Sequence, residues 1–456
     1  MTFPSSDGHR FVCTDLDDGG AGTGTFDLEG EALVVHVPGL VPGDVATVAL
    51  DHVSSHHKPD GRHAWARLVS LQTPSPNRVA PSCGRQGPCG GCPLMLLGDD
   101  AQRAFKRRRV ERAFAAYPAL ATVIVDACEP SPRGLGYRNH AKFVFGPERW
   151  GGKNVLGAFA PRSHSIVDQT GCQVIEPVLE AARAALLPLL SAVPAFDEVT
   201  RVGILHHVVL RSNRHGQVLV ALVIGKPEWP EAEALAAAIG QACPFVSGVV
   251  LNVNLSRGNA IMGDQDRLLF GQATLDDDIG KVRVRLSARS FFQANRDVAT
   301  ALYAGVRAAV ATIAPVDRVV DVYSGAGGIA QSLDGLCREA IAIEENPATT
   351  SAAETFLREQ GIALLFLTGD AAEGLGKIDR AEVVVLNPPR KGCDRAVLDR
   401  VLALRPRRVV YVSCDPSTLA RDLAVLVEGG GRIVGARPFD MMPHTPHVET
   451  LAIVEF

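Results

Sequence analysis

Two apolar segments toward the end of the sequence finish in residues suited to covalent chemistry. Val385–Gly392 and Val409–Pro416 each begin with a β-branched run and end in polar residues and prolines. This pattern is typical of buried parallel strands whose carboxyl ends open into a site, which is where open α/β sheets bind ligands. We therefore interpret Cys414 as a nucleophile, Asn387 as a ligand anchor and Glu449, from a later segment, as a base.

A glycine-rich loop further upstream indicates a cofactor. The apolar run Arg318–Tyr323 leads into Ser324–Gly328, where glycines let the backbone approach a ligand before a helix begins. The next strand ends at Glu344, about 20 residues further on, where a carboxylate can hold the hydroxyls of a ribose. Nicotinamide, flavin and S-adenosylmethionine enzymes all use this pattern. Because the loop is neither a full G-x-G-x-x-G nor a Walker motif, a cofactor without phosphate is favoured.

Three of the 10 cysteines, Cys83, Cys89 and Cys92, are close together in the sequence. The glycines between them permit tight turns, so that the three thiolates can converge on one metal centre. A fourth ligand must come from elsewhere, and Cys172 is the leading candidate. Such a set holds either a tetrahedral zinc or an iron–sulfur cluster, and spacing does not decide between them.

The composition is that of an ordinary globular protein. The 456 residues exceed what one core can organise and predict two or three domains, and 46% hydrophobic with 21% charged residues are usual values. No apolar run could span a bilayer and the start shows no secretory signal, so we expect a cytoplasmic protein without a membrane partner. The net charge of -4 excludes a protein coated in positive charge but permits a local basic groove.

The order of predicted elements divides the chain into three regions and indicates an α/β protein. Residues 1–75 contain short strands broken by glycine and proline, typical of a small β-barrel that binds nucleic acid, or of a β module without a ligand. Residues 76–286 mix strands with amphipathic helices, as in an α+β domain. From 287 to 456 strands and helices alternate regularly, which predicts a Rossmann-like, doubly wound sheet.

A predicted helix near the start of the second region is rich in cations. Between Asp99 and Ala116 it contains Arg103, Lys106, Arg107, Arg108, Arg109 and Arg112. Several of them fall on one side of a helix, where they could line a stripe that faces phosphates. A solvated charged face explains the same pattern.

Together these motifs resemble the RNA uridine-5-methyltransferase family, with its TrmA, RlmC and RlmD types. The resemblance is carried by Phe291–Asn295, Asp321–Gly328, Asn387–Gly392, Ser413–Asp422 and Pro443–Glu449. It covers nearly the whole chain, because the N-terminal β module looks like the TRAM domain of RlmD-type members. It implies a monomeric enzyme that binds RNA and uses S-adenosylmethionine, with a [4Fe-4S] cluster of structural or RNA-positioning role.

The family's chemistry explains the residue types near the end of the sequence. Uracil C5 is a poor nucleophile, so a thiolate, by resemblance that of Cys414, first adds to C6 and creates an enolate at C5. A helix beginning at Pro416 and nearby cations are expected to stabilise this thiolate. After methyl transfer, a base must remove the C5 proton, and Glu449 matches the family position for it.

The resemblance also implies the remaining site residues. The cofactor contacts are expected at Gln293, Tyr323, Gly325, Gly327, Glu344, Asp370 and Asn387, and the cluster ligands at Cys83, Cys89, Cys92 and Cys172. Within the cofactor set, Gln293 is expected to reach the methionine end, Glu344 the ribose hydroxyls and Asp370 the adenine amino group.

The expected substrate is RNA, with ribosomal RNA favoured over transfer RNA. The N-terminal module is RlmD-like, whereas Asn387 is typical of RlmC-like members at a position where the other types more often carry aspartate. We therefore favour 23S ribosomal RNA and keep transfer RNA as the alternative. An amino-group methyltransferase is less favoured because Arg390 replaces the aromatic residue of its Asn-Pro-Pro motif. The presence of both Cys414 and Glu449 argues against a non-catalytic iron–sulfur RNA-binding protein.

Overall fold

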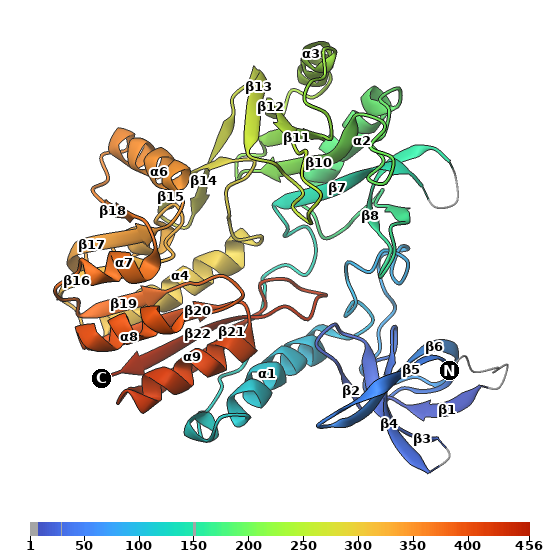
Figure 1. Ribbon diagram of the computed structural model, residues 1–456, viewed down its shortest axis with the longest axis horizontal. Helices are drawn as coiled ribbons and strands as arrows, with labels where there is room; N and C mark the ends of the chain where they lie inside the picture. The colour runs from blue at the N-terminus through green and yellow to red at the C-terminus, as the bar shows by residue number, and fades with distance from the viewer. Residues whose placement is uncertain (1–7, 29, 149–151) are drawn as a thin grey trace. The chain divides into compact units, whose positions relative to one another are not determined.

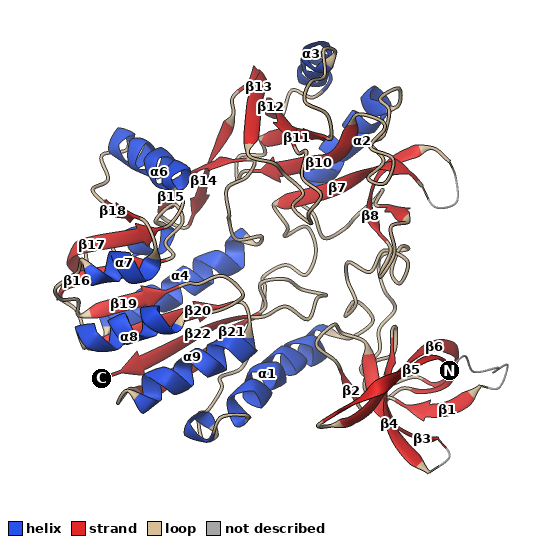
Figure 2. Cartoon of the chain, viewed as in Figure 1, coloured by secondary structure: helices blue, strands red, loops and turns tan. Residues whose placement is uncertain are grey.

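A computed structural model describes residues 8–28, 30–148 and 152–456, and these form two compact units (Figures 1 and 2). The first unit comprises Met1–Arg109 and Met442–His447, and the second comprises Val110–Met441 and Val448–Phe456. Within the described ranges, no helix combines the length and the apolar character needed to cross a membrane.

The first unit is built on a six-stranded sheet of order β1-β5-β6-β4-β3-β2. Its strands are β1 (His9–Val12), β2 (Asp15–Leu16), β3 (Gly22–Leu28), β4 (Glu31–Val37), β5 (Val45–Lys58) and β6 (Gly61–Thr73). Alternate residues of β4, namely Leu33, Val35 and Val37, are fully buried, so one face of the sheet forms the core of this unit. Helix α1 (Asp99–Ala115) begins in this unit.

The second unit contains two seven-stranded sheets, the first of which has the order β13-β12-β11-β10-β7-β8-β9. Its strands are β7 (His140–Pro147), β8 (Asn154–Phe159), β9 (Ile166–Asp168), β10 (Leu205–Ser212), β11 (Val218–Ile224), β12 (Val246–Val253) and β13 (Gln265–Gly271). Helices α2 (Pro177–Leu190) and α3 (Ala232–Ala242) pack against this central sheet through one apolar core. The hairpin of β14 (Thr274–Ile279) and β15 (Val282–Ser287) follows it.

The second sheet has the order β18-β17-β16-β19-β20-β22-β21. Its parallel strands are β16 (Val316–Val322), β17 (Cys337–Glu344), β18 (Leu365–Thr368), β19 (Val383–Leu386) and β20 (Arg408–Ser413). Strand β22 (Glu449–Glu455) lies antiparallel between β20 and β21 (Arg432–Phe439). This arrangement confirms the predicted α/β, Rossmann-like fold.

Helices cover both faces of this second sheet (Figure 2). One face packs against helices α7 (Ala371–Gly376), α8 (Arg395–Leu404) and α9 (Pro416–Glu428), together with the end of α1 and the turn η1 (Pro118–Leu120). The other face packs against α4 (Arg296–Ala311), α5 (Gly328–Ser332) and α6 (Pro347–Glu359). The strand ends are consequently the part of this sheet that helices leave open to a ligand.

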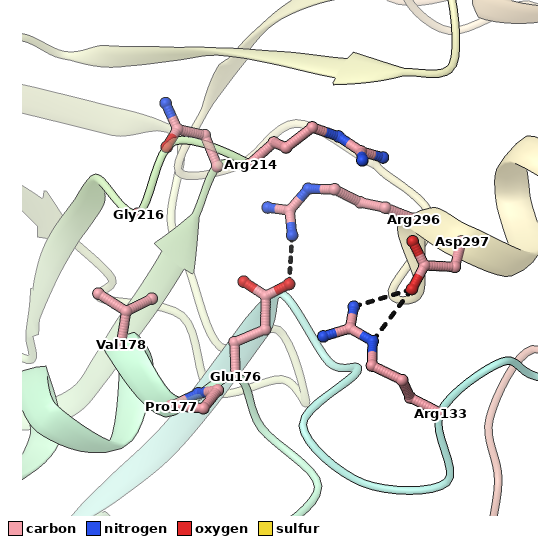
Figure 3. A pocket seen from close by; sticks show the side chains of 9 residues that line it. Arg133, Glu176, Pro177, Val178, Arg214, Gly216, Arg296 and Asp297 are labelled. Atoms are coloured by element: carbon pink, nitrogen blue, oxygen red, sulfur yellow. Dashed lines mark hydrogen bonds and ion pairs between the residues drawn. The ribbon is translucent and has the colours of Figure 1, made fainter.

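A buried ion network joins helix α4 to the central sheet. Arg296, which is 3% exposed, forms ion pairs with Glu176 and with Asp277, and also donates to the backbone oxygen of Ser212. A cavity of about 250 Å³ lies beside this network, and Arg133 pairs with Asp297 at its edge (Figure 3). Because buried charges must be paired, this network fixes the start of α4, which immediately follows Gln293–Asn295.

Candidate active site

Strand register brings the two predicted catalytic residues to the same edge of the sheet. In the antiparallel pair of β20 and β22, Ser413 lies opposite Thr450. The next residues along the two strands are Cys414 and Glu449, so they are neighbours at the carboxyl end of β20. Strand β19 pairs in parallel with β20 and ends at Leu386, which places Asn387 at this edge as well.

Cys414 is half-buried between the end of β20 and the start of α9. Burial raises the pKa of its thiol, and the charges of Glu449 and Asp415 raise it further, while Arg390 lowers it. The expected nearby cation is thus present as Arg390, but burial and the two carboxylates outweigh it, so the pKa of the thiol is raised rather than lowered. The N-terminal amides of α9 are used instead by Asp415, whose carboxylate accepts from Ser417 N at 2.9 Å and Thr418 N at 3.0 Å.

Glu449 is 7% exposed, and burial raises the pKa of its carboxyl to about 7, with Arg390 acting in the opposite direction. A carboxyl group with this pKa exchanges a proton readily at neutral pH, as a general base must. Arg390 is the cation that acts on both Glu449 and Cys414. The sequence contained a signal for it, since it lies in the Asn-Pro-Pro-Arg motif, but its electrostatic role was not predicted.

The loop that carries Arg390 is fastened to helix α9 by a buried carboxylate. Asp422 accepts hydrogen bonds from Cys393 N at 2.7 Å and from the Tyr411 hydroxyl at 2.6 Å, and it pairs with Arg421. The hydroxyl of Thr418 donates to Arg390 O at 3.1 Å. These contacts hold the loop after β19 against the helix after β20, so the position of the Arg390 backbone depends on α9.

The glycine loop after β16 is shaped by two carboxylates. Glu344, at the end of β17, accepts from Gly325 N at 2.9 Å and Asn346 N at 3.0 Å. Asp321 is buried and accepts from Ala330 N at 3.0 Å, and burial raises its pKa to about 7. Gly327 has φ +74°, and a Cβ there would lie 2.5 Å from the side chain of Leu364. Asp321 was not predicted as a site residue, although the motif beginning at it was recognised.

Tyr323 follows β16 with a left-handed backbone, φ +62°. A non-glycine residue in this region costs about 1–2 kcal/mol, and such strain clusters at functional sites. The conformation turns the chain from the strand into the glycine loop. Tyr323 thus lies at the same sheet edge as Asn387, because Val322 pairs with Leu386.

Two other predicted cofactor residues are held by their neighbours. Gln293 is buried, and its backbone oxygen accepts from the Asn139 side chain at 2.8 Å, which ties it to the central sheet. Asp370 caps helix α7, since its Oδ1 atom accepts from Ala372 N at 2.8 Å and Glu373 N at 3.1 Å. Any contact of Asp370 with an adenine amino group must therefore use its other oxygen.

The predicted cluster ligands belong to different units. Cys83, Cys89 and Cys92 lie half-buried in a turn-rich loop of the first unit, and Cys172 lies half-buried in the second. Arg85 N donates to Cys83 Sγ at 3.4 Å. Among the described residues, no group of three or more histidines, cysteines, aspartates and glutamates is arranged to hold a metal ion. The thiol chemistry fits a soft metal centre, and the cluster stays a prediction.

Much of the basic helix α1 is turned inward. Lys106 is fully buried and donates to Met442 O at 2.9 Å, while Arg109 donates to Pro446 O. Arg103 pairs with Asp100 within the same helix. The predicted phosphate-facing stripe is therefore reduced to its exposed members, Arg108 and Arg112.

These observations define the class of protein: an α/β methyltransferase sheet with a cysteine, a carboxyl group and a glycine loop at its carboxyl edge. A family model described as tRNA (Uracil-5-)-methyltransferase matches residues 204–455. The chain belongs to this family of S-adenosylmethionine-dependent RNA uracil-5-methyltransferases, as the predicted resemblance indicated.

Relatives support the same assignment over almost the whole chain. An uncharacterised RNA methyltransferase of Geobacter sulfurreducens is 39% identical over 98% of this chain and 89% of its own length. One from Halalkalibacterium halodurans is 34% identical, over 95% and 94%. The crystal structure of Pyrococcus abyssi tRNA (uracil-54, C5)-methyltransferase with S-adenosyl-L-homocysteine is similar with a TM-score of 0.76 and 25% identity, covering 98% of this chain and 100% of that one.

The glycine loop gives a direct test of the cofactor site. We expect Gly327→Ala to weaken S-adenosylhomocysteine binding by at least about tenfold, because the added Cβ both meets Leu364 and favours another backbone conformation. The matched control is Gly335→Ala, which has φ +77° but nothing within 4 Å of the added atom. Calorimetric titration of both variants measures the effect, and equal affinities would show that the loop does not hold the cofactor.

Proposed function

We propose that the protein methylates C5 of a uridine in 23S ribosomal RNA through a covalent bond between Cys414 and uracil C6. The observation that carries this proposal is the register of β20 and β22, which makes Cys414 and Glu449 neighbours at the ligand-binding edge. Two side chains with these roles are what C5 methylation needs, since one must add to the ring and the other must remove a proton.

The first chemical step is the addition of the Cys414 sulfur to C6. The thiol must lose its proton to solvent. The charges of Glu449 and Asp415 oppose this loss, and the charge of Arg390 favours it. Bond formation moves the ring electrons onto C5 and O4 as an enolate. Arg390 is placed to stabilise both the thiolate and the enolate by its charge.

Methyl transfer and release complete the reaction. S-adenosylmethionine, when bound, would supply the methyl group to C5 and leave as S-adenosylhomocysteine. Glu449 then removes the C5 proton, the electrons of that C–H bond restore the C5–C6 double bond, and Cys414 leaves as a thiolate. For the cofactor we propose contacts with Gln293, Tyr323, Gly325, Gly327, Glu344, Asp370 and Asn387, most of which lie at the carboxyl edge or in the loops that leave it.

The choice of RNA rests on the N-terminal region. The likeness of its β module to the TRAM domain of RlmD-type members supports 23S ribosomal RNA. Transfer RNA is the second candidate, because the similar Pyrococcus abyssi enzyme is a tRNA (uracil-54, C5)-methyltransferase. In either RNA the target base must leave its stack, at a cost on the order of a few kcal/mol, which loops and bulges reduce.

A mechanism-based trap tests the covalent step. We expect RNA containing 5-fluorouridine, incubated with S-adenosylmethionine and the protein, to form a stable methylated adduct at Cys414, because fluorine cannot leave as a cation. Denaturing mass spectrometry identifies the adducted residue, and the attached oligonucleotide identifies the site in 23S or transfer RNA. Cys414→Ala should form none, while Cys337→Ser, at the start of β17, should react normally. No adduct with either RNA, from protein that binds the cofactor, would overturn the covalent mechanism.

The charge balance predicts how the reaction depends on pH. Because burial raises the pKa of Glu449 to about 7, its base form grows as the pH rises through neutrality, and the rate of adduct resolution should rise with a midpoint near this value. Arg390→Gln removes the opposing charge, so its midpoint should move to higher pH. Lys391→Gln is the matched control, since Lys391 is exposed and pairs with Asp394. Rapid-quench measurement of methylated product from pH 6 to 9 gives the profiles, and a flat profile would exclude Glu449 as the base.

The cluster is a further part of this proposal, with Cys83, Cys89, Cys92 and Cys172 as ligands. Protein purified without oxygen should contain about four irons and four sulfides per chain, with a broad visible absorption. Cys89→Ser should lower this content and weaken RNA binding, while Cys337→Ser should leave both unchanged. Stoichiometric zinc with no acid-labile sulfide would overturn the iron–sulfur assignment.

A further inference from the structure

One face of the central sheet gathers cations beside the cofactor segment. Strands β7 and β10 are antiparallel, and their register places Arg211 opposite His140 and Val209 opposite Lys142. Because side chains alternate between faces, His140, Lys142 and Arg211 lie on the same face. The intervening residues, such as Ala141 and Leu210, are buried in the core under α2 and α3.

Two cations of this face, Arg138 and Lys142, are not paired with a carboxylate among the described residues. Lys142 is exposed and Arg138 is half-buried, and neither has an ion pair with any residue that the structure describes. Burial and the charges of Arg211 and Arg138 lower the pKa of Lys142. Burial lowers the pKa of His140 well below its usual value, as do the same charges and that of Lys142.

The carboxylates of Asp277 and Glu176 already have hydrogen-bond partners on both oxygens. Asp277 accepts from Arg296 Nε at 2.6 Å through one oxygen and from Arg214 N at 2.8 Å through the other. Glu176 pairs with Arg296 through one oxygen and accepts from the Ser212 hydroxyl at 2.5 Å through the other. The charge of Asp277 stabilises the guanidinium of Arg211, but no hydrogen bond joins the two residues among the described contacts.

Buried donors at this face have no partner in the described structure. Arg211 is 2% exposed, and its Nη2 donates a hydrogen bond to Ser290 O. Its Nε and Nη1 atoms have no hydrogen-bond partner among the described residues. His140 Nε2 is also buried without a partner. Native proteins pair almost all buried polar groups, so such atoms mark a place where a partner or a rearrangement completes the site.

The face adjoins the segment proposed to hold the cofactor. Asn139 N donates to Ala294 O at 3.0 Å, and the Asn139 side chain donates to Gln293 O at 2.8 Å. Arg211 contacts Ser290 O, three residues before Gln293. An anion bound on this face would therefore lie near the segment that we propose contacts the cofactor.

We propose that Arg138 and Lys142 bind backbone phosphates of the RNA beside the target uridine, with Arg211 as a positioning residue whose buried charge makes this strand face positive. This inference rests on the proposed function and adds the surface that grips the substrate. Arg138 and Lys142 lie four positions apart, which in an extended chain corresponds to roughly 13 Å, so the two cations can meet separate phosphates of one extended strand. An acidic peptide fits less well, because the bound anion must belong to a molecule whose base reaches the cofactor.

Salt-dependent binding tests the surface. A short fluorescein-labelled oligouridylate is titrated with protein at several KCl concentrations and followed by anisotropy. Lys142→Gln should weaken binding by about tenfold and reduce the slope of log Kd against log salt by about 0.7, the value for one phosphate on a single strand. The matched control is Lys377→Gln, an exposed lysine that caps the far end of α7, which should leave the slope unchanged.

A second pair of variants addresses the buried charge. Arg211→Gln should reduce the slope, and Arg211→Lys should restore it, which a purely structural role would not do. Affinity for S-adenosylhomocysteine should stay the same in Lys142→Gln, because that lysine does not belong to the proposed cofactor set. An unchanged Kd and slope in Lys142→Gln would overturn the inference, as would displacement of the oligouridylate by polyglutamate at equal charge.

The two levels of proposal can fail separately. If the wild-type protein forms 5-methyluridine while Lys142→Gln binds RNA normally, the phosphate surface is wrong and the proposed activity stands. If the wild-type protein yields no 5-methyluridine but Lys142→Gln lowers the salt slope, the surface binds RNA and the proposed activity is wrong.

Discussion

The position of strand β22 is the constraint on which the candidate active site depends. Five parallel strands alone would bring Asn387 and Cys414 to one edge, since β19 and β20 are neighbours. Only the antiparallel insertion of β22 adds Glu449, because its first residue lies where β20 ends. A slip of one residue in this pairing would turn Glu449 to the other face of the sheet. The buried apolar residues of β22, Leu451, Ala452 and Val454, therefore also help to fix the position of Glu449.

One cation, Arg390, offsets the effects that oppose ionisation of Cys414 and Glu449. Burial disfavours charge on both Cys414 and Glu449, and the charge of Glu449 further opposes ionisation of Cys414. Arg390 is the group that acts against both effects. Its loop is held by Asp422, a fully buried carboxylate on α9, so the balance of charge depends on a network outside the reacting groups. Geometry and electrostatics are thus linked through one helix.

The residues at strand ends could be predicted from the sequence because their signal is local. Apolar runs that end in polar residues identified Cys414 and Asn387, and the glycine loop identified Glu344. Interactions between distant segments could not be predicted in this way. Lys106 was expected to lie in a stripe that faces phosphates or on a solvated face, yet it donates to Met442 O, more than 300 positions away, and is buried. The direction of the Cys414 pKa was missed for the same reason, since burial and Glu449 come from tertiary packing. The sequence of the central sheet predicted no functional residues, because only strand pairing brings Arg211 and Lys142 to the same face.

The raised pKa of Cys414 also affects how readily this residue is oxidised. Oxidants and alkylating agents attack the thiolate far faster than the thiol. Burial and the charge of Glu449 raise the pKa of Cys414, which favours the thiol form and makes the sulfur a poorer target for peroxide. The charges that oppose ionisation of this thiol thus also protect it against oxidation to a sulfinic acid.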